Sequence, residues 1–366
     1  MRQLYAGVMS GTSLDGVDAV IADFAPGGGR PCELLAAAHV PFPRSLADEL
    51  FALQRPGGDE LARAARAANA LADTYADAIA AALDGAAVAA RDVVAAGVHG
   101  QTLRHCPDQS WTLQLNNPAR VAERAGVAVV ADFRSRDVAA GGEGAPLVPA
   151  FHAALFAGEA HRVVVNIGGI ANLTDLPARG DVRGFDTGPG NVLLDFWHAR
   201  HRNAAYDRGG AWARSGHVND ALLAALVAEP YLSRRPPKST GRDLFNADWL
   251  DAKLAGRDVA PADVQATLVA FTARTIADAV RAHCATATEV LVCGGGALNK
   301  ALMEALAARL APRVLTTTAS QGVAVLDVEA LAFAWLAREA LAGRPGNLPA
   351  VTGARGLRVL GAIYPA

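Results

Sequence analysis

The chain has 366 residues, of which 52% are hydrophobic and 19% are charged. This length suggests two domains or one large one, and this much apolar material supports a folded core rather than a disordered chain. The formal net charge is −2, so no broad basic surface is indicated. Binding to nucleic acid or to an anionic membrane through charge alone is therefore disfavoured.

Neither the cysteines nor the apolar runs point to a secreted or membrane protein. No two cysteines form a C-x-x-C pair, so neither a disulfide framework nor a structural zinc site is indicated. No uncharged apolar run approaches the roughly 20 residues that span a bilayer, and polar side chains interrupt any apolar leader at the N-terminus. We expect a soluble cytoplasmic protein. The four cysteines are Cys32, Cys106, Cys284 and Cys293.

The first elements predicted along the chain are two strands joined by a tight turn. A strand over 3–9, a Ser-Gly-Thr-Ser turn and a strand over 17–24 make a hairpin. Residues 45–83 follow a helical pattern in which many of the apolar positions are alanine, which suits close helix packing. Short buried strands are predicted at 93–98 and 127–130, and each leads into a polar loop.

A glycine- and proline-rich stretch over 141–147 is the predicted hinge or domain boundary. After it the opening pattern returns, with strands over 161–166 and 171–176 on either side of a Gly168-Gly169 turn. Each half of the chain thus begins with a strand, a glycine turn and a strand. This is a weak internal repeat of architecture.

The remainder of the chain alternates helices with further strands. Hairpins mixed with helices favour α/β layers over an all-α or all-β fold. We predict helices over 190–203, 216–228, 262–283, from about 299, and over 327–342, and strands over 289–293 and 356–364.

Three glycine turns each follow a predicted strand directly, namely Ser10–Ser13, Gly168-Gly169 and Gly294–Gly296. Glycine lets the backbone approach a ligand closely and present N–H groups to an anion. One such turn is usually only a turn, but three favour a nucleotide or phosphate ligand. The sequence has no G-x-x-x-x-G-K-[S/T] loop and no protein-kinase motif set, and its one G-x-G, at 188–190, lacks the third glycine of a dinucleotide motif.

Asp186 is the strongest candidate for acid–base chemistry. It follows an apolar residue and precedes a glycine-rich turn into a helix. A carboxylate there can accept a proton while nearby N–H groups hold an anion. On spacing alone, an aspartate that forms a turn or caps a helix is an equal alternative.

Other polar residues at strand ends admit two interpretations each. His99 ends an apolar strand, as structural and functional histidines both do. Arg134 and Arg136 are suited to gripping a carboxylate or phosphate, or to ordinary surface salt bridges. Magnesium prefers few carboxylates together with waters and phosphate oxygens. The carboxylates that suit it are Asp15, Asp18, Asp132 and Glu329.

Nine stretches, spread over nearly the whole chain, together resemble one family, the anhydro-N-acetylmuramic acid kinases. Each is weak alone, but their number and order make the resemblance specific. They are GVMSGTSLDGVD (7–18), HGQT (99–102), ADFR (131–134), GAPL (144–147), NIGGIAN (166–172), FDTGPGN (185–191), KSTGR (238–242), CGGG (293–296) and EALAFA (329–334).

The resemblance implies an α/β fold of the sugar kinase, Hsp70 and actin type. Two domains, each with a mixed central sheet, would close over ATP in a cleft. The N-terminal domain would take residues 1–130 and 346–366, and the C-terminal domain residues 131–345. The first and second hairpins would hold phosphates, and the later glycine turn would pack on adenosine.

The resemblance also assigns roles to individual residues. The general base maps onto Asp186. The implied nucleotide contacts are Gly11, Thr12, Ser13, Leu14, Asp15, Gly16, Val17, Asp18, Gly168, Gly169, Gly294, Gly295 and Gly296. The implied sugar contacts are His99, Gln101, Arg134 and Asn166, with Arg134 the first choice for the lactyl carboxylate, and Glu329 is the implied contact to Mg²⁺.

The implied reaction uses ATP and water to convert 1,6-anhydro-N-acetylmuramic acid to N-acetylmuramic acid 6-phosphate and ADP, a step in peptidoglycan recycling. Asp186 would activate the water that attacks the anomeric carbon. Ordinary glycosidases need a second carboxyl group to protonate the leaving oxygen. Here the γ-phosphoryl group captures that oxygen, so one base suffices. A homodimer is implied by the resemblance alone.

Two departures from the family pattern and three alternatives accompany this interpretation. Glu143 stands where the family has Gln, and Val325-Leu326-Asp327 replaces a segment with a Pro-Asp pair, so an acidic contact at 326 is absent. A kinase for a different sugar is the main alternative, because one fold hosts several substrates. A non-catalytic ATP-binding regulator is disfavoured by the presence of Asp186. An actin- or Hsp70-like assembly ATPase needs an added partner-binding region, and none is visible in the sequence.

Overall fold

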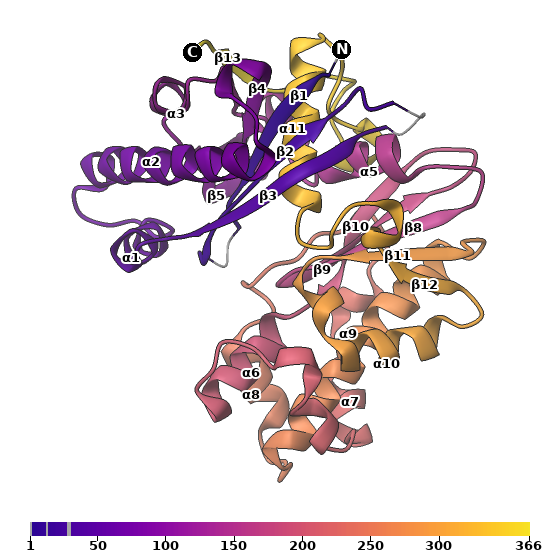
Figure 1. Ribbon diagram of the computed structural model, residues 1–366. Coiled ribbons are helices and arrows are strands. Elements are labelled where there is room, and N and C mark those ends of the chain that lie inside the picture. The colour runs from indigo at the N-terminus through magenta and orange to yellow at the C-terminus, as the bar shows by residue number, and fades with distance from the viewer. Residues whose placement is uncertain (1, 12–13, 28–30) are drawn as a thin grey trace. The chain divides into compact units, whose positions relative to one another are not determined.

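The computed structural model describes residues 2–11, 14–27 and 31–366. The chain forms two compact α/β units (Figure 1). Unit 1 takes the chain up to Leu155 and again from Asp327 to the C-terminus, and unit 2 takes Phe156–Leu326.

The strands and helices of unit 1 include both ends of the chain. Its strands are β1 (Leu4–Met9), β2 (Gly16–Asp23), β3 (Glu33–Pro41), β4 (Val93–Val98), β5 (Gln101–Cys106), β6 (Trp111–Leu115), β7 (Val129–Ala131) and β13 (Ala362–Tyr364). Its helices are α1 (Arg44–Ala52), α2 (Glu60–Ala86), α3 (Pro118–Ala125), α4 (Ser135–Ala139), α5 (Val148–Phe156), α11 (Val328–Leu341) and α12 (Pro349–Thr352).

Unit 2 is built from one continuous stretch of chain. Its strands are β8 (Arg162–Ile167), β9 (Ile170–Leu176), β10 (Arg183–Pro189), β11 (Glu289–Cys293) and β12 (Val314–Thr317). Its α-helices are α6 (Val192–Arg202), α7 (Asp220–Val227), α8 (Ala247–Leu254), α9 (Pro261–His283) and α10 (Lys300–Leu310).

The main sheets of the two units share one topology. The strand order is β13-β7-β4-β1-β2-β3 in unit 1 and β12-β11-β8-β9-β10 in unit 2. In each sheet the opening hairpin and its next strand are antiparallel, while the first strand of the hairpin pairs in parallel with a later strand. The weak repeat in the sequence is thus a repeat of topology. The predicted α/β fold, with a mixed sheet in each of two parts, is confirmed.

The helical pattern predicted over 45–83 forms two helices, α1 and α2. The break falls at Pro56-Gly57-Gly58, where proline lacks the N–H that a helix needs and glycine disfavours helix. The side chains of Leu71, Tyr75 and Ile79 recur on one face of α2 and are fully buried. They pack on β1 and β2, together with Leu4, Ala6 and Val8.

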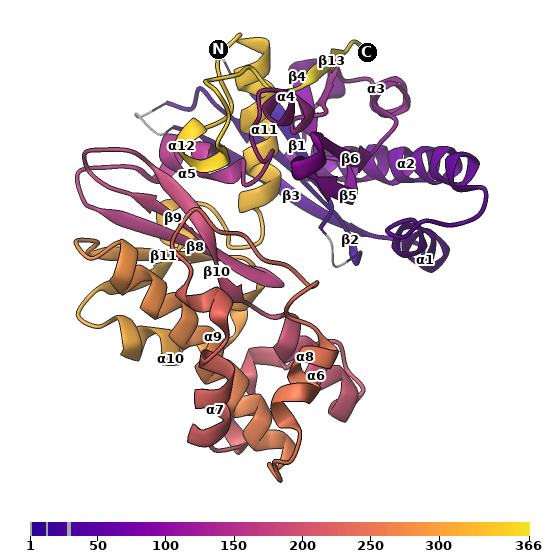
Figure 2. The same cartoon turned by 180° about the vertical axis from the view of Figure 1, so that it is seen from behind.

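Helix α11 covers the opposite face of the same sheet at very close range (Figures 1 and 2). A Cβ on Gly7 in β1 would lie 1.9 Å from the carbonyl oxygen of Ala330, and one on Gly97 in β4 would lie 1.9 Å from that of Phe333. Only glycine permits backbone to approach backbone so closely. These two glycines therefore determine how closely α11 packs on the sheet. They also determine the position of the residues at the start of that helix.

The unit boundaries differ from the predicted domain boundaries, which lay at 130/131 and 345/346. Residues 131–155 lie in unit 1, where β7 pairs with β4 and β13. Residues 327–345 also lie there, because α11 packs on β1 and β4. Strand pairing and helix packing, which leave no mark on composition, thus place both segments.

The predicted hinge at 141–147 is tied down inside unit 1. The fully buried Asp137 carboxylate accepts hydrogen bonds from Gly144 N (2.8 Å), Asn347 Nδ2 (2.7 Å) and Thr352 Oγ1 (2.8 Å). The N–H of Glu143 also donates to the Thr352 carbonyl at 2.7 Å. The glycines and proline here form a loop that is hydrogen-bonded to the C-terminal segment.

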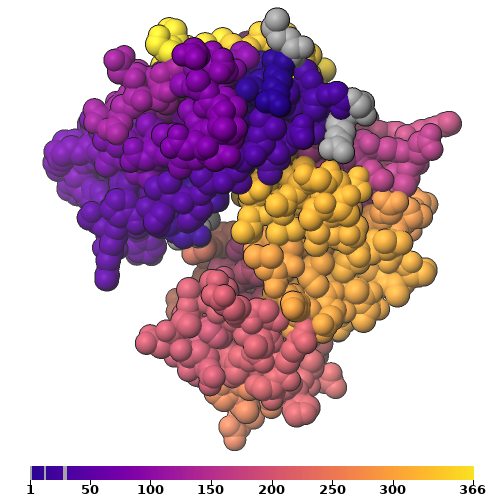
Figure 3. Space-filling model, in the orientation of Figure 1, coloured from indigo at the N-terminus to yellow at the C-terminus, as the bar shows by residue number. Residues whose placement is uncertain are grey.

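Unit 2 divides into a sheet end and a helical end. Helix α9 is buried along most of its length and packs on β9 and β10 as well as on α6, α7 and α10. Helices α6, α7 and α8 gather at one end of the unit (Figure 2), and in the space-filling view residues from about 200 to 260 form a lobe there (Figure 3).

The close seat of α11 leads to a stability prediction. In Gly97→Ala the new methyl group would overlap the Phe333 carbonyl oxygen, so β4 or α11 must shift. We therefore expect the free energy of unfolding of unit 1 to fall by about 3 kcal/mol or more. Urea unfolding, with hydrogen exchange of the β4 and α11 peptides as the readout of unit 1, measures this. The matched control is Gly58→Ala, because a Cβ at Gly58 has nothing within 4 Å. Equal stability of the two variants would contradict the packing described.

Candidate active site

A row of three polar residues crosses the sheet of unit 2. Asn166 in β8 pairs in register with Asn172 in β9, and Asn172 pairs in turn with Asp186 in β10. Directly paired residues of neighbouring strands project to the same face of a sheet. All three are half-buried in a sheet whose other side chains are largely apolar. Asn166 and Asp186 are both predicted site residues. The row brings them onto one face of the sheet although they are far apart in sequence.

Asp186 is held by a segment more than forty residues further along the chain. Its N–H donates to the Lys238 carbonyl at 3.2 Å, and its own carbonyl accepts the Tyr231 hydroxyl at 2.8 Å. Its carboxylate Oδ2 accepts the Thr240 N–H at 3.0 Å. We call residues 231–242 the strap. The strap fixes both the backbone of Asp186 and the orientation of its carboxylate.

The electrostatic surroundings of Asp186 suit proton transfer near neutral pH. Burial raises the pKa of its carboxyl group to about 6, while the Thr240 N–H and the positive charge of Lys238 oppose that rise. A base is most effective when its pKa lies near the working pH, because it is then both deprotonated and basic. A half-buried carboxylate with such a pKa is a candidate general base.

Lys238 is itself buried and constrained. Its Nζ donates to the Leu232 carbonyl at 3.1 Å and lies 4.8 Å from the centre of the Tyr231 ring. Burial and Arg234 lower the pKa of this ammonium group, and Asp186 raises it. Sequence reasoning assigned no role to Tyr231, Lys238 or Thr240. The available signal was the KSTGR stretch, which entered only as part of the resemblance.

The second glycine turn is tied to the start of α6. The carbonyl of Gly168 accepts the Asn191 N–H at 2.8 Å, and that of Gly169 accepts the N–H groups of Gly190 and Val192 at 2.9 and 3.1 Å. A Cβ on Gly190 would lie 2.3 Å from the Gly168 oxygen. The glycines at 168–169 and at 190 thus belong to one packed corner.

The third glycine turn lies against the end of β8. Gly294 has a positive φ of +79°, and its N–H donates to the Val325 carbonyl at 2.8 Å. A Cβ on Gly294 would lie 2.3 Å from Asn166 Oδ1, and one on Gly296 would lie 2.2 Å from Ile167 Cγ2. The structure therefore brings Asn166 and the turns at 168–169 and 294–296 together at one end of the unit 2 sheet.

The predicted residues of the first hairpin lie in unit 1. Thr12 and Ser13 fall outside the described residues. The Gly11 carbonyl accepts the Leu14 N–H at 3.3 Å and Gln101 Nε2 at 3.2 Å, so Gln101 braces the turn from a fully buried position. Gly16 and Val17 begin β2. A Cβ on Gly16 would lie 2.5 Å from the Val40 carbonyl.

His99 and Arg134, both predicted as sugar contacts, form one cluster in unit 1. His99 Nε2 accepts from Arg134 Nε at 3.0 Å and Nη2 at 2.9 Å, while Arg134 Nη1 donates to the Gly144 carbonyl at 2.8 Å. Burial and the Arg134 charge hold the pKa of His99 well below its usual value, so the ring is neutral. Its Nδ1 has no hydrogen-bond partner among the described residues. Much of the Arg134 guanidinium is thus already engaged.

Three acidic residues lie near the start of α11 and the first hairpin. The charge of Glu329 acts on Arg134 and raises the pKa of that guanidinium against the effect of burial, which lowers it to about 10. Burial and the nearby charge of Asp18 raise the pKa of Asp327. Asp18 also contacts His39 Nδ1 at 2.8 Å. Among the described residues, no three His, Cys, Asp or Glu side chains are grouped to hold a metal ion.

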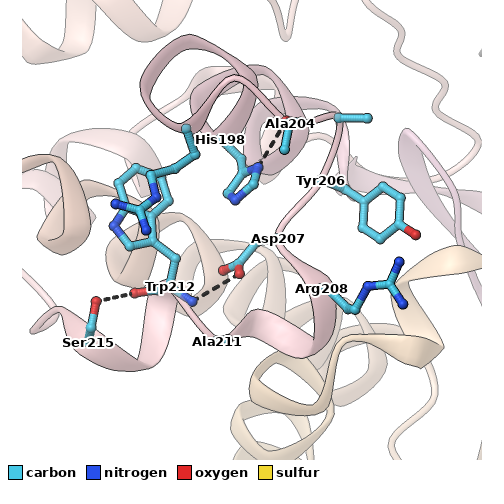
Figure 4. Close-up of a pocket in the computed structure, with 10 residues that line it drawn as sticks. His198, Ala204, Tyr206, Asp207, Arg208, Ala211, Trp212 and Ser215 are labelled. Carbon is cyan, nitrogen blue, oxygen red and sulfur yellow. Dashed lines mark hydrogen bonds between the residues drawn. The ribbon is translucent and has the colours of Figure 1, made fainter.

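A separate pocket of about 610 Å³ lies in the helical end of unit 2 (Figure 4). One of its lining residues is the buried Asp207, whose carboxylate accepts the N–H groups of Trp212 and Ala213 at 2.9 Å each. None of the predicted site residues lines it. The lining residues are His198, Arg202, Ala204, Ala205, Tyr206, Asp207, Arg208, Ala211, Trp212 and Ser215.

No helix in the described part of the chain is both long and apolar enough to cross a membrane.

Known proteins of one family match this chain over nearly its whole length. A family model described as anhydro-N-acetylmuramic acid kinase matches residues 3–366. A relative named anhydro-N-acetylmuramic acid kinase from Thiobacillus denitrificans is 55% identical over 365 residues, covering 99% of this chain and 97% of that protein. One of the same name from Bordetella petrii is 57% identical over 368 residues, covering 100% and 97%.

Among solved structures, a ROK family glucokinase from Streptomyces griseus in complex with glucose and AMPPNP is similar, with a TM-score of 0.42 and 16% sequence identity. The match covers 92% of this chain and 99% of that one.

The surroundings of Asp186 lead to a titration prediction. Because the charge of Lys238 favours the carboxylate form, Lys238→Met should raise the pKa of Asp186 further above its value of about 6. Lys238→Arg, which keeps the charge, should restore most of the difference. Carbon-detected NMR titration of the aspartate carboxyl groups measures this directly. Lys253→Met is the control, since Lys253 pairs with Glu229 instead. A fall in the pKa, or no change, in Lys238→Met would contradict the assigned effect.

Proposed function

The chain belongs to the anhydro-N-acetylmuramic acid kinase family, and from this premise we propose that it is an ATP-dependent kinase of 1,6-anhydro-N-acetylmuramic acid. It opens the 1,6-anhydro ring with water and transfers a phosphoryl group to O6, giving N-acetylmuramic acid 6-phosphate and ADP. The observation that carries the proposal is the Asp186 carboxylate. It is oriented by the strap and has a pKa near 6, in the same unit as two glycine turns.

Asp186 acts as the general base on the water. Its Oδ2 accepts the Thr240 N–H, which leaves Oδ1 to take the proton as the water oxygen bonds to the anomeric carbon. The bond from that carbon to O6 breaks, and O6 keeps the electron pair. O6 then bonds to the γ-phosphorus, the bond from that phosphorus to the bridging oxygen breaks, and ADP leaves. One base suffices because phosphorus takes the place of the proton that a leaving oxygen usually needs.

The glycine turns supply the nucleotide contacts in this proposal. As the resemblance implies, we propose that Gly168-Gly169 presents backbone to the phosphates and that Gly294–Gly296 packs on adenosine, with the stretch Gly11–Asp18 as the other phosphate-binding sequence. A Cβ on Gly294 or Gly296 would lie less than 2.5 Å from the side chain of Asn166 or Ile167, so the chain's own packing keeps this turn free of side chains. Turns without side chains let a phosphate chain or a ring approach the backbone.

The sugar contacts are proposed as the resemblance implies them. Asn166 shares a sheet face with Asp186, which supports the proposal that it binds sugar hydroxyls. Gln101 braces the first turn through Gly11, with its Oε1 unpaired among the described residues. His99 and Arg134 act as a pair. Arg134 has N–H groups left for the lactyl carboxylate beyond those given to His99 and Gly144.

The residues near the first hairpin fit Mg²⁺. Burial, and after it the charge of Asp18, raises the pKa of the Asp327 carboxyl group, and a cation beside it would oppose both effects. Two carboxylates also suit an ion that takes most of its ligands from water and phosphate oxygens. Glu329, the contact to the ion that the resemblance implies, remains our proposal for this role, and its charge also acts on Arg134. When bound, Mg²⁺ supplies charge neutralisation for phosphoryl transfer.

The use of ATP is consistent with a cytoplasmic location, and a homodimer is proposed on the resemblance alone.

Isotope-resolved mass spectrometry tests the reaction. Purified protein with Mg-ATP and the anhydro sugar in ¹⁸O-water should give a product heavier by one water and one phosphoryl group, with ¹⁸O at the anomeric position. An unlabelled phosphorylated product would contradict hydrolytic opening. An unchanged sugar, with nucleotide bound to folded protein, would favour a kinase of a different sugar or a non-catalytic regulator.

Substitution of the base gives a second prediction. Asp186→Asn should keep the fold and nucleotide binding but lower kcat by roughly 10³-fold, because an amide cannot accept the water proton. Steady-state kinetics with a nucleotide-binding assay measures both. Asp248→Asn, a change of the same kind at an exposed position in α8, should be neutral. Wild-type activity of Asp186→Asn at neutral pH would rule out the assignment.

A further inference from the structure

Arg242 ends the strap, two residues after the Thr240 N–H that holds Asp186. A tight turn fixes its backbone. The N–H groups of Leu244 and Phe245 donate to the Gly241 carbonyl at 3.3 and 3.1 Å, and Asn246 Nδ2 donates to the Arg242 carbonyl at 3.2 Å. The backbone that positions the base therefore also positions this arginine.

The Arg242 side chain lies over the second glycine turn. A Cβ on Gly169 would meet Arg242 Nη2 at 3.6 Å and Nε at 3.9 Å. Gly169 has no side chain, so nothing from that residue separates the guanidinium from the turn. The two are in position to face one ligand.

The guanidinium is also unpaired. Arg242 is exposed, and within the described parts of the chain no hydrogen bond or salt bridge engages its side-chain nitrogens. Other arginines of unit 2 are matched at close range, as Arg200 is with Asp251 and Arg183 with Asp175. The charge of Arg242 acts on Asp195, near the start of α6. It lowers the pKa of that carboxyl group, while burial raises the pKa to about 6. An unpaired planar cation over a phosphate turn is suited to a bidentate oxyanion.

We propose that Arg242 binds the γ-phosphoryl group during its transfer and that the strap thereby sets the distance between general base and phosphoryl group. This rests on the proposed function. The phosphoryl group is favoured over the lactyl carboxylate because Arg242 lies on the Gly168-Gly169 turn, which takes phosphate in that proposal. Since the two bond changes are coupled, one segment that contacts both the base and the phosphoryl group aligns them together. An arginine at that group stabilises the charge that spreads over its oxygens.

Binding measurements on Arg242→Gln test the assignment. Calorimetric titrations use a non-hydrolysable ATP analogue, ADP and the anhydro sugar, each with Mg²⁺. We expect affinity for the analogue to fall about tenfold or more while affinities for ADP and sugar change less than about twofold, and kcat to fall on the order of 10²–10³-fold. Arg242→Lys should recover only part of kcat, because an ammonium lacks the planar fork. Arg235→Gln, at an exposed site on the same strap, is the control.

Several results would overturn the assignment. Loss of sugar affinity with unchanged analogue affinity would mean that Arg242 binds the carboxylate. Equal losses for the analogue and ADP would place the contact at the α- or β-phosphate, and unchanged affinities with unchanged kcat would remove Arg242 from the site. If wild-type protein binds nucleotide but neither binds nor converts the sugar, the proposed function fails. The comparison of analogue with ADP still tests Arg242 in that case.

Discussion

Backbone contact between α11 and the central strands of unit 1 is the constraint on which that unit depends. Gly7 and Gly97 let the helix approach until carbonyl groups touch the positions of missing side chains. A helix seated so closely cannot shift along the sheet without a clash. Asp327 and Glu329 lie at the start of this helix, so packing on the two glycines sets the positions from which their charges act on Asp18 and Arg134.

The repeated topology places three paired residues side by side at corresponding positions of the two sheets. In unit 2 the row runs through Asn166, Asn172 and Asp186. In unit 1 the strands of the same topological positions pair Met9 with Asp18, and Asp18 with His39. The two halves have thus kept one geometry and changed its chemistry. Unit 2 has an acid near neutral pKa, and unit 1 has an exposed histidine–carboxylate contact.

Much of the fold could be predicted from local patterns. The strand, glycine turn and strand units and helices α9 and α11 lie where the pattern placed them, whereas the helical pattern over 45–83 forms two helices. Strand β3 and the β5–β6 hairpin were missed. The side chains of β3 are mostly only partly buried, and it is an edge strand whose place depends on pairing with β2. The glycine-rich loop at 141–147 looked like a hinge because composition cannot reveal that Asp137 binds it.

The site divides in the same way. Asp186 was a candidate because of its neighbours in sequence, and spacing left base and helix cap equally open. The structure places it inside β10, while Asn191 takes the position before α6. Its partners Tyr231 and Thr240 lie 45 and 54 residues away, and such contacts arise only from tertiary folding. For Arg134 the sequence left an anion contact and a surface salt bridge both open, and its hydrogen bonds to His99, 35 residues earlier in the chain, arise only from tertiary folding.

The discontinuity of unit 1 has a consequence for how the protein is made. Residues 156–326, which form unit 2, are synthesised between the two parts of unit 1. Domains commonly form in order of synthesis, starting from the N-terminus. Here the first strands leave the ribosome without α11, β13, or the Asn347 and Thr352 side chains that satisfy buried Asp137. All residues of unit 2 are therefore made before unit 1 is complete, and one face of the N-terminal sheet stays uncovered until α11 has been synthesised.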